Sequence, residues 1–183
     1  MFTAAGSPDQ EAQIVSGKII YDGLGRPTTS YYPTTTTTID AEFSTAISSV
    51  IPTKTEYDEV GRAVKVTLPD GSTNTTAFKI DTFEGVSTML TTQTDALNKT
   101  VQSQTDVKGS NLASIQNDLV TKFDINALGE TIQVTDAMDH ITKSSYDWLG
   151  RRTEFTHPDA GTTTMQYDLA GNLTTRITQD IKN

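Results

Sequence analysis

The sequence has no cysteine, few basic residues relative to acidic ones, and no long apolar run. The absence of cysteine excludes a disulfide scaffold and a cysteine-based metal site. There are 14 Lys and Arg against 23 Asp and Glu, so the net charge is −9. Because an acidic chain repels phosphate backbones, we expect no nucleic-acid partner. No apolar stretch approaches the ~20 residues that cross a bilayer, so we also expect no membrane span.

Hydrophobic residues are scarce as well. They make up 34% of the chain, below the roughly 45–50% (a figure that counts Gly) of ordinary globular proteins. The core must therefore be thin, or neighbouring chains must cover it. Residues 1–8 lack the basic and apolar regions of a signal peptide. We expect residues 1–13 to be disordered or to be the end of a fragment of a longer chain.

Strand-forming and turn-forming polar residues are abundant instead. Thr is conspicuous, and Ser, Asn, Asp and Gly are frequent. Thr favours strands because it is β-branched, whereas Gly, Asn and Asp favour turns. This composition predicts an all-β fold with many short strands.

A six-residue motif recurs along the chain. Its strongest copies are Tyr21-Asp22-Gly23-Leu24-Gly25-Arg26, Tyr57-Asp58-Glu59-Val60-Gly61-Arg62, Tyr146-Asp147-Trp148-Leu149-Gly150-Arg151 and Tyr167-Asp168-Leu169-Ala170-Gly171-Asn172. Weaker copies are Phe123-Asp124, with Gly129 two residues late, Ile80-Asp81 and Thr105-Asp106. Asp followed by x-x-Gly indicates a turn, because Asp bonds to nearby backbone amides and Gly adopts positive φ.

A second turn signal lies between these copies. Its members are Pro69-Asp70-Gly71, Asp95-Ala96-Leu97-Asn98, Asp136-Ala137-Met138-Asp139 and Pro158-Asp159-Ala160-Gly161. Successive aspartates of the two signals are 9–14 residues apart. The repeating unit therefore contains two turns and two strands.

The segments between the turns have the period of a strand. In residues 131–135, Ile132 and Val134 should share one face, which is typical of a half-buried strand. The chain is therefore predicted to form an antiparallel meander of hairpins. We expect the tyrosines of the motif to form an inward ladder, with Tyr57, Tyr146 and Tyr167 substantially buried and the following aspartates bonded to the turn backbone.

The tyrosine-aspartate-x-x-glycine-arginine copies and the Pro-Asp-Gly and Ala-Gly returns resemble the YD-repeat, or RHS-repeat, family, over residues 21–26 and 57–183. The resemblance implies a β-sheet strip that spirals into a hollow shell. Such shells enclose toxin domains in bacterial toxin complexes and polymorphic toxins, and similar repeats occur in wall-associated and adhesive surface proteins. The family's aspartyl autoprotease is built around Asp-Pro-x-Gly. No Asp-Pro occurs here, so self-cleavage is not carried over.

The motif positions are expected to have a structural role in each repeat. They are Tyr21, Asp22, Gly25, Arg26, Tyr57, Asp58, Gly61, Arg62, Phe123, Asp124, Tyr146, Asp147, Gly150, Arg151, Tyr167, Asp168 and Gly171. Residues 57–183 are predicted to be the repeat strip. Residues 14–56 are predicted to be an irregular first repeat with a Thr-rich insertion, residues 34–38, and a short helical turn at 41–47.

Some carboxylates and histidines are candidate chemical sites. Asp136, Asp139 and His140 could hold a metal ion, but they occupy the position of a hairpin turn, and so does His157. A residue repeated in every unit has a structural task in that unit, whereas catalytic carboxylates need distinct environments. We therefore expect no catalytic residue, no metal and no cofactor. An Asp–Arg pair across each turn is expected, and an exposed pair would contribute little.

Two functions remain open. The first is a non-catalytic shell segment of a secreted or surface-exposed bacterial toxin-type protein, whose partners would be the rest of a larger repeat polypeptide and an enclosed toxin domain. The second is a carbohydrate- or cell-surface-binding adhesive module, with Trp148, Tyr31 and Tyr32 as candidate glycan contacts. We also expect self-association through unpaired strand edges or inner faces, with Trp148 or the tyrosine ladder near the contact. The net charge opposes it.

Overall fold

The computed structural model describes residues 13–36 and 50–179. The described residues form sixteen strands and no helix, so the predicted all-β meander is confirmed. The helical turn expected at 41–47, part of the Thr run and most of the segment 1–13 lie outside the described residues.

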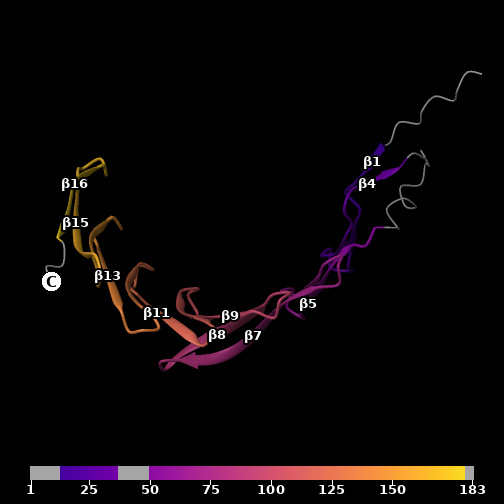
Figure 1. Ribbon diagram of the computed structural model, residues 1–183, viewed down its shortest axis with the longest axis horizontal. Coiled ribbons are helices and arrows are strands. Elements are labelled where there is room, and N and C mark those ends of the chain that lie inside the picture. The colour runs from indigo at the N-terminus through magenta and orange to yellow at the C-terminus, as the bar shows by residue number, and fades with distance from the viewer. Residues whose placement is uncertain (1–12, 37–49, 180–183) are drawn as a thin grey trace, which may run out of the picture. The chain divides into compact units, whose positions relative to one another are not determined.

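The strands are short, and most are joined by tight turns (Figure 1). They are β1 (Gln13–Val15), β2 (Ile19–Tyr21), β3 (Pro27–Ser30), β4 (Thr34–Thr36), β5 (Thr53–Tyr57), β6 (Ala63–Thr67), β7 (Thr73–Phe83), β8 (Val86–Thr94), β9 (Thr100–Thr105), β10 (Asn111–Gln116), β11 (Leu119–Ile125), β12 (Thr131–Thr135), β13 (Ile141–Tyr146), β14 (Arg152–His157), β15 (Gly161–Tyr167) and β16 (Leu173–Gln179).

The strand order follows the chain order. β2, β3 and β5 to β16 form a 14-stranded sheet in which each strand is hydrogen-bonded to its neighbours in sequence, and β1 pairs with β4. The strand pairs are antiparallel, for example β3 and β5, where Thr29 lies opposite Lys54. Such local pairing needs no crossover connection.

The chain divides into two compact units. The first contains the residues up to Thr76 together with Asp95–Leu97, and the second contains Ala77–Thr94 and the residues from Asn98 onward. In the first unit, the pairing of β3 with β5 joins the β2–β3 hairpin to the β5–β6 hairpin. In the second, the hairpins β9–β10, β11–β12, β13–β14 and β15–β16 follow one another.

Burial is slight in both units, as the low apolar content predicts. Ala113 is the one fully buried hydrophobic residue of the described part, and Thr88, Gln104 and Thr163 are buried polar residues. The prediction that Ile132 and Val134 share a half-buried face is therefore confirmed only in part, because Val134 is half-buried but Ile132 is 39% exposed. A single sheet without a second layer leaves side chains on both faces in contact with solvent.

One hairpin departs from the predicted spacing. Asp81 was expected to begin a turn, but it lies inside β7, and the turn comes at Glu84-Gly85, both with positive φ. A two-residue turn of this type suits the twist of a hairpin. β8 therefore extends past β9, since Met89 pairs with Thr105 at the end of β9. The prediction for Ile80-Asp81 was wrong because the strand continues beyond the aspartate.

The tip of the β7–β8 hairpin reaches a distant strand of the second unit. Glu84 accepts a hydrogen bond from Lys122 on β11 at 2.6 Å. The Lys122 ammonium also lies 6.0 Å from the centre of the Phe83 ring. These contacts bring together strands that are not neighbours in the sheet.

Candidate functional site: a ladder of turns and two surface pockets

Each motif turn closes through the same two backbone hydrogen bonds. In the 22–26 turn, the Gly25 amide donates to the Asp22 carbonyl at 3.0 Å, and the Asp22 amide donates to the Arg26 carbonyl at 2.9 Å. Gly25 has φ of 78°. This is a three-residue hairpin loop in which a type I turn is followed by a left-handed residue. The same pair of bonds closes the turns 58–62, 68–72, 106–110, 126–130, 136–140, 147–151 and 168–172.

The first side chain of the turn bonds to the backbone ahead of it. Asp147 Oδ1 accepts hydrogen bonds from the amides of Leu149 and Arg151, at 2.9 and 3.0 Å. Its Oδ2 accepts from Arg151 Nε at 2.7 Å. Asp22 makes the corresponding three bonds with Leu24 and Arg26. The expected Asp–Arg pair is therefore joined to a backbone turn that the same carboxylate organises.

These bonds favour the ionised carboxylate. The pKa of Asp22 is lowered, chiefly by the hydrogen bond from the Arg26 amide. For Asp147, partial burial of the carboxyl acts in the opposite direction, but the Arg151 amide and guanidinium outweigh it and the pKa is lowered. The Asp147 side chain is only 17% exposed. A carboxylate that accepts several hydrogen bonds is stabilised in its charged form.

In the first unit, the turns 22–26 and 58–62 are bonded to each other. The Arg26 guanidinium lies 4.7 Å from the centre of the Tyr57 ring and donates to the Asp58 carbonyl at 3.4 Å. In return, the Tyr57 hydroxyl donates to the Pro27 carbonyl at 2.9 Å. The arginine at the end of one turn thus binds the tyrosine–aspartate start of the next.

The second unit repeats this arrangement. Arg151 lies 4.8 Å from the centre of the Tyr167 ring and donates to the Asp168 carbonyl at 3.0 Å. The Tyr167 hydroxyl donates to the Arg152 carbonyl at 2.9 Å. Tyr146 donates in the same way to the Thr131 carbonyl, just after the 126–130 turn, at 3.1 Å. We call these linked turns the turn ladder: 22–26 with 58–62 in the first unit, and 126–130, 147–151 and 168–172 in the second.

The ladder tyrosines are partly buried, as predicted, but they do not form the predicted inward ladder. Tyr57, Tyr146 and Tyr167 are half-buried and Tyr21 is exposed. The reason is that these rings lie at the ends of strands beside the turns, where they contact a guanidinium or donate to a backbone carbonyl. A hydroxyl that bonds to a carbonyl at the sheet margin does not require an inward-facing core.

One turn of the ladder was assigned to the wrong residues. Asp124 lies within β11 opposite Gln133, and the turn starts two residues later at Asn126. Asn126 Oδ1 accepts from the amides of Leu128 and Glu130, both at 3.0 Å, and its Nδ2 donates to Glu130 Oε2 at 2.7 Å. An Asn–Glu pair therefore replaces Asp–Arg here. Gly129, three residues after Asn126, is the sequence signal that marks the true position of this turn.

A threonine two residues after the turn also belongs to the pattern. The hydroxyls of Thr28, Thr153 and Thr174 donate to the carbonyls of Ile20, Ser145 and Gln166, at 3.2, 3.2 and 3.1 Å. Each threonine is six residues after the turn aspartate. This bond satisfies a carbonyl where the register of each hairpin shifts. The spacing is visible in the sequence as a Thr six residues after the turn aspartate.

Two members of the second turn signal, 68–72 and 136–140, form turns with the same closing backbone bonds. Asp136 accepts from the amides of Met138 and His140, and its Oδ2 lies 3.0 Å from His140 Nδ1. Asp139 occupies the glycine position with φ of 62°. These residues bond within one turn, which agrees with the hairpin interpretation. Within the described residues, no group of three His, Cys, Asp or Glu is placed to hold a metal ion.

The candidate glycan contacts lie in different units. Trp148, in the second unit, is 84% exposed at the tip of the 147–151 turn. Tyr31 and Tyr32, in the first unit, follow β3. Lys18 Nζ lies 5.0 Å from the centre of the Tyr31 ring, and Thr53 donates to the Tyr32 hydroxyl at 3.4 Å. An exposed indole offers a flat apolar face to a ligand.

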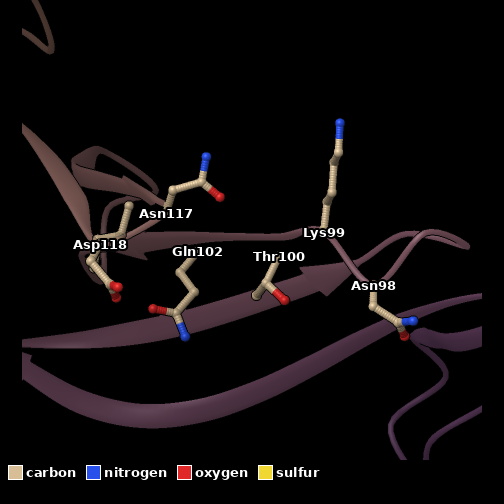
Figure 2. Close-up of a pocket in the computed structure, with 7 residues that line it drawn as sticks. Asn98, Lys99, Thr100, Gln102, Asn117 and Asp118 are labelled. Atoms are coloured by element: carbon tan, nitrogen blue, oxygen red, sulfur yellow. The ribbon is translucent and has the colours of Figure 1, made fainter.

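The surface of the second unit has pockets, and two of them are defined by their lining residues. The larger, of about 330 Å³, is lined by Asn98, Lys99, Thr100, Gln102, Ile115, Asn117 and Asp118. Its polar side chains do not converge: in Figure 2, Lys99 and Thr100 point to opposite sides of the strand. The smaller, of about 250 Å³, lies under the β7–β8 hairpin tip and is lined by Phe83, Glu84, Val86, Leu112, Lys122, Phe123, Asp124 and Ile125. Neither has the few convergent polar groups of a specific ligand site.

Comparisons with known proteins place the fold. No family model matches the chain, and no curated protein matches it. A crystal structure of TcdB2-TccC3 matches 91% of this chain with a TM-score of 0.69 and 18% identity, and a crystal structure of TcdB2-TccC3-Cdc42 matches with a TM-score of 0.68. A Tc holotoxin pore from Photorhabdus luminescens matches 94% of the chain with a TM-score of 0.51 and 16% identity.

These matches extend over a small part of the solved chains. This chain covers 9% of the TcdB2-TccC3 chain and 11% of the holotoxin chain. At such low identity the likeness shows the fold: an antiparallel hairpin meander of the kind found within Tc toxin chains. In the described ranges, no helix is long and apolar enough to cross a membrane.

Proposed function

We propose that the chain is a non-catalytic structural segment of a YD/RHS-repeat shell, in a secreted or surface-exposed bacterial toxin-type protein, and that it encloses or presents a partner domain. The observation that carries the proposal is the turn ladder. Its recurrent residues bond to their own turn or to the adjacent one, for example Arg151 to Asp147, Tyr167 and Asp168. The fold likeness to Tc toxin chains supports the same role.

The bonding of the aspartates supports a non-catalytic role. Asp58 and Asp168, like Asp22 and Asp147, accept hydrogen bonds from the residue that ends their own turn. The pKa of Asp168 is lowered, mainly by the side chain and amide of Asn172. A general acid near neutral pH needs a raised pKa instead. The same environment in turn after turn favours a structural task.

The slight burial supports a continuous array with neighbours on both sides. A repeat of this kind contacts mainly its neighbours, so its stability depends on nearest-neighbour bonds. Exposed apolar side chains at the turn tips, such as Val107, Leu128 and Leu169, leave apolar surface for another part of a larger assembly.

The test uses the native polypeptide that contains this segment, with limited proteolysis of its partner domain as the readout. Gly150→Pro removes the amide that donates to the Asp147 carbonyl and should break the ladder. Leu169→Ser, at an exposed turn tip, is the matched control. We expect the partner domain to resist protease in the native and Leu169→Ser proteins and to be cleaved in Gly150→Pro. Equal cleavage in all three would contradict an enclosing role.

The alternative is a carbohydrate-binding adhesive module, and the exposure of Trp148 favours it. Trp148 is the only tryptophan, so its fluorescence would report a sugar stacked on the indole. Saturable quenching by a member of a glycan panel, lost in Trp148→Ala, would support this alternative. No change with any glycan would exclude Trp148 as a contact.

A further inference from the structure

The β7–β8 hairpin is longer than the hairpins on either side of it. β7 has 11 residues, and its register with β6 covers Thr73 to Thr75. β8 is paired with β9 from Met89 to Thr94, so Val86–Thr88 extend past the end of β9. The hairpin tip, residues 83–86, reaches Lys122 on β11 through Glu84. The tip therefore contacts a strand that is separated from β8 by β9 and β10.

The base of this hairpin is firmly held. The Thr88 hydroxyl donates to Gln104 Oε1 on β9, and Gln104 Nε2 donates to Asp81 Oδ2 on β7 at 3.5 Å. Thr88 and Gln104 are buried, and Gln104 lies opposite Ala113, which is fully buried. A buried polar group that loses its partner incurs its full desolvation cost. These bonds therefore resist separation of the hairpin base from the sheet.

The tip is held by weaker contacts. The Glu84 and Lys122 side chains are 57% and 47% exposed, and exposed ion pairs contribute little to stability. The Lys122 ammonium is 6.0 Å from the centre of the Phe83 ring, the outer limit of a cation–π contact. Asp124 and Asp139 also attract Lys122, so the ammonium keeps carboxylate neighbours when the tip moves away. The hairpin thus has a firm base and a loosely held tip.

Glu84 is a poor residue for its position in the turn. Its φ of 49° lies in the left-handed region, which Gly, Asn and Asp tolerate better. The turn between β10 and β11 has Asn117 and Asp118 at such angles, with φ of 52° and 62°. Glu84 weakens its own turn but supplies the carboxylate that reaches Lys122. A residue that opposes its local conformation and makes a long-range contact is typical of a clamp or switch.

The tip covers an apolar space. The pocket of about 250 Å³ beneath it has apolar walls formed by Phe83, Val86, Leu112, Phe123 and Ile125. Phe83 and Leu112 are half-buried. Because Phe83 and Val86 belong to the tip and Leu112 to β10, movement of the tip alone would uncover Leu112.

We propose that residues 83–86 form a lid that opens and closes over this apolar space while the hairpin base stays in place, and that the Glu84–Lys122 ion pair makes the closed state sensitive to ionic strength. Opening breaks the ion pair and the contacts of Phe83, but it leaves the pairing of β8 with β9 intact, since that pairing begins at Met89. Salt screens an exposed pair and so favours the open state. The lid is a property of this hairpin and does not depend on the proposed shell function.

The absence of cysteine allows one introduced thiol to report opening. Leu112→Cys places a thiol beneath the lid, Ala113→Cys places one at the buried base, and Val107→Cys places one on a turn tip that is 92% exposed. The probe is iodoacetamide, which is uncharged. Its rate at a covered thiol follows the population of the open state when opening and closing are fast.

The lid variants are made in the Leu112→Cys protein. Glu84→Gln should raise the rate of thiol modification about two- to fivefold, the range for an exposed ion pair. About 1 M NaCl should raise the rate of the parent by a similar factor and leave the Glu84→Gln protein unchanged. Glu56→Gln is the matched control, because it removes the similarly exposed pair with Lys65 in the first unit, and it should have no effect.

A second substitution separates the lid from its turn. Glu84→Asn removes the carboxylate but suits the left-handed conformation, so it should raise the Leu112→Cys rate as Glu84→Gln does without lowering the urea midpoint. Ile125→Cys, which also lines the space, gives an independent readout of the same opening. Circular dichroism checks that every variant retains its strands.

Three results would overturn the proposal. The first is a Leu112→Cys rate that Glu84→Gln does not change, or that already equals the rate of Val107→Cys in the parent. The second is an equal increase for Ala113→Cys, which would mean that the base opens together with the tip. The third is an equal effect of Glu56→Gln.

Discussion

The glycine at the fourth position of a ladder turn should set the stability of that turn. Gly129 has φ of 86° and Gly150 has φ of 77°. We expect Gly129→Ala to destabilise the protein by about 1 kcal/mol. The left-handed conformation costs an L-residue ~1–2 kcal/mol, and the lower entropy of the unfolded chain offsets part of that cost.

The two glycines differ in their surroundings, and this gives a second measurement. A Cβ added at Gly129 would meet nothing within 4 Å, whereas one at Gly150 would lie 3.1 Å from Glu130 Oε1. Gly150→Ala should therefore cost a few tenths of a kcal/mol more than Gly129→Ala, since the end of a flexible side chain can move aside. The difference should disappear when both substitutions are made in a Glu130→Ala background, which is a double-mutant cycle.

Asparagine is the matched control for backbone conformation. Asn98 and Asp139 already occupy the glycine position of their turns, with φ of 59° and 62°. Gly129→Asn should thus cost less than half as much as Gly129→Ala, because Asn and Asp tolerate the left-handed region.

Urea unfolding followed by circular dichroism measures the total cost. Hydrogen exchange at residue 129, whose amide donates to the Asn126 carbonyl at 3.0 Å, reports the turn itself. The local measurement is needed because long arrays can unfold one part at a time. If Ala and Asn at position 129 were equally costly, or if neither changed exchange, backbone conformation would not be what holds these turns.

Further predictions concern side-chain bonds. Tyr146→Phe and Tyr167→Phe should each lower the unfolding free energy by about 1 kcal/mol, while Tyr21→Phe should leave that of the monomer unchanged, as measured by urea unfolding. The pKa values of Asp22, Asp136 and Asp168 are lower in the folded protein than the ~3.9 of an unfolded aspartate. These carboxylates therefore stabilise the fold above pH ~3.9, and this stabilisation should be lost as pH falls through their folded pKa values. A urea midpoint that is constant from pH 6 to 2 would contradict this. The hydrogen bond from the Lys122 ammonium to the Glu84 carboxylate raises the pKa of Lys122. The stability that this pair contributes should therefore be lost only as pH rises through the raised pKa. Lys122→Met should abolish the part of the stability loss between pH 9 and 12 that this pair causes.

The fold class could be predicted because its signals are local. A hairpin meander needs only strand residues and turn residues in alternation, and each turn is specified within five residues. The 22–26, 58–62, 147–151 and 168–172 turns occur where the sequence indicates them, and the 106–110 turn does so with Thr105 in place of the tyrosine. Pairing between neighbours in sequence then determines the sheet order.

The misplaced turns had ambiguous local signals. At Phe123-Asp124, the aromatic–acidic pair indicates a turn two residues too early, whereas Asn126 is three residues before Gly129 and forms the same bonds as Asp. At Ile80-Asp81 there was no glycine three residues later, and the strand continues to Glu84-Gly85. Positive φ at the fourth position is the stronger requirement, because several side chains can accept the turn amides but few residues adopt that conformation cheaply.

The contacts between turns could not be predicted from any single repeat. Tyr57 comes 31 residues after Arg26, across the Thr-rich insertion, whereas Tyr167 comes only 16 residues after Arg151. Arg26 nevertheless contacts the Tyr57 ring as closely as Arg151 contacts the Tyr167 ring. What makes the contacts equivalent is adjacency in the sheet, which depends on β3 pairing with β5. A sheet with so little core can therefore keep its order through bonds at its margin. The insertion lengthens the connection between two ladder turns without altering how they bond.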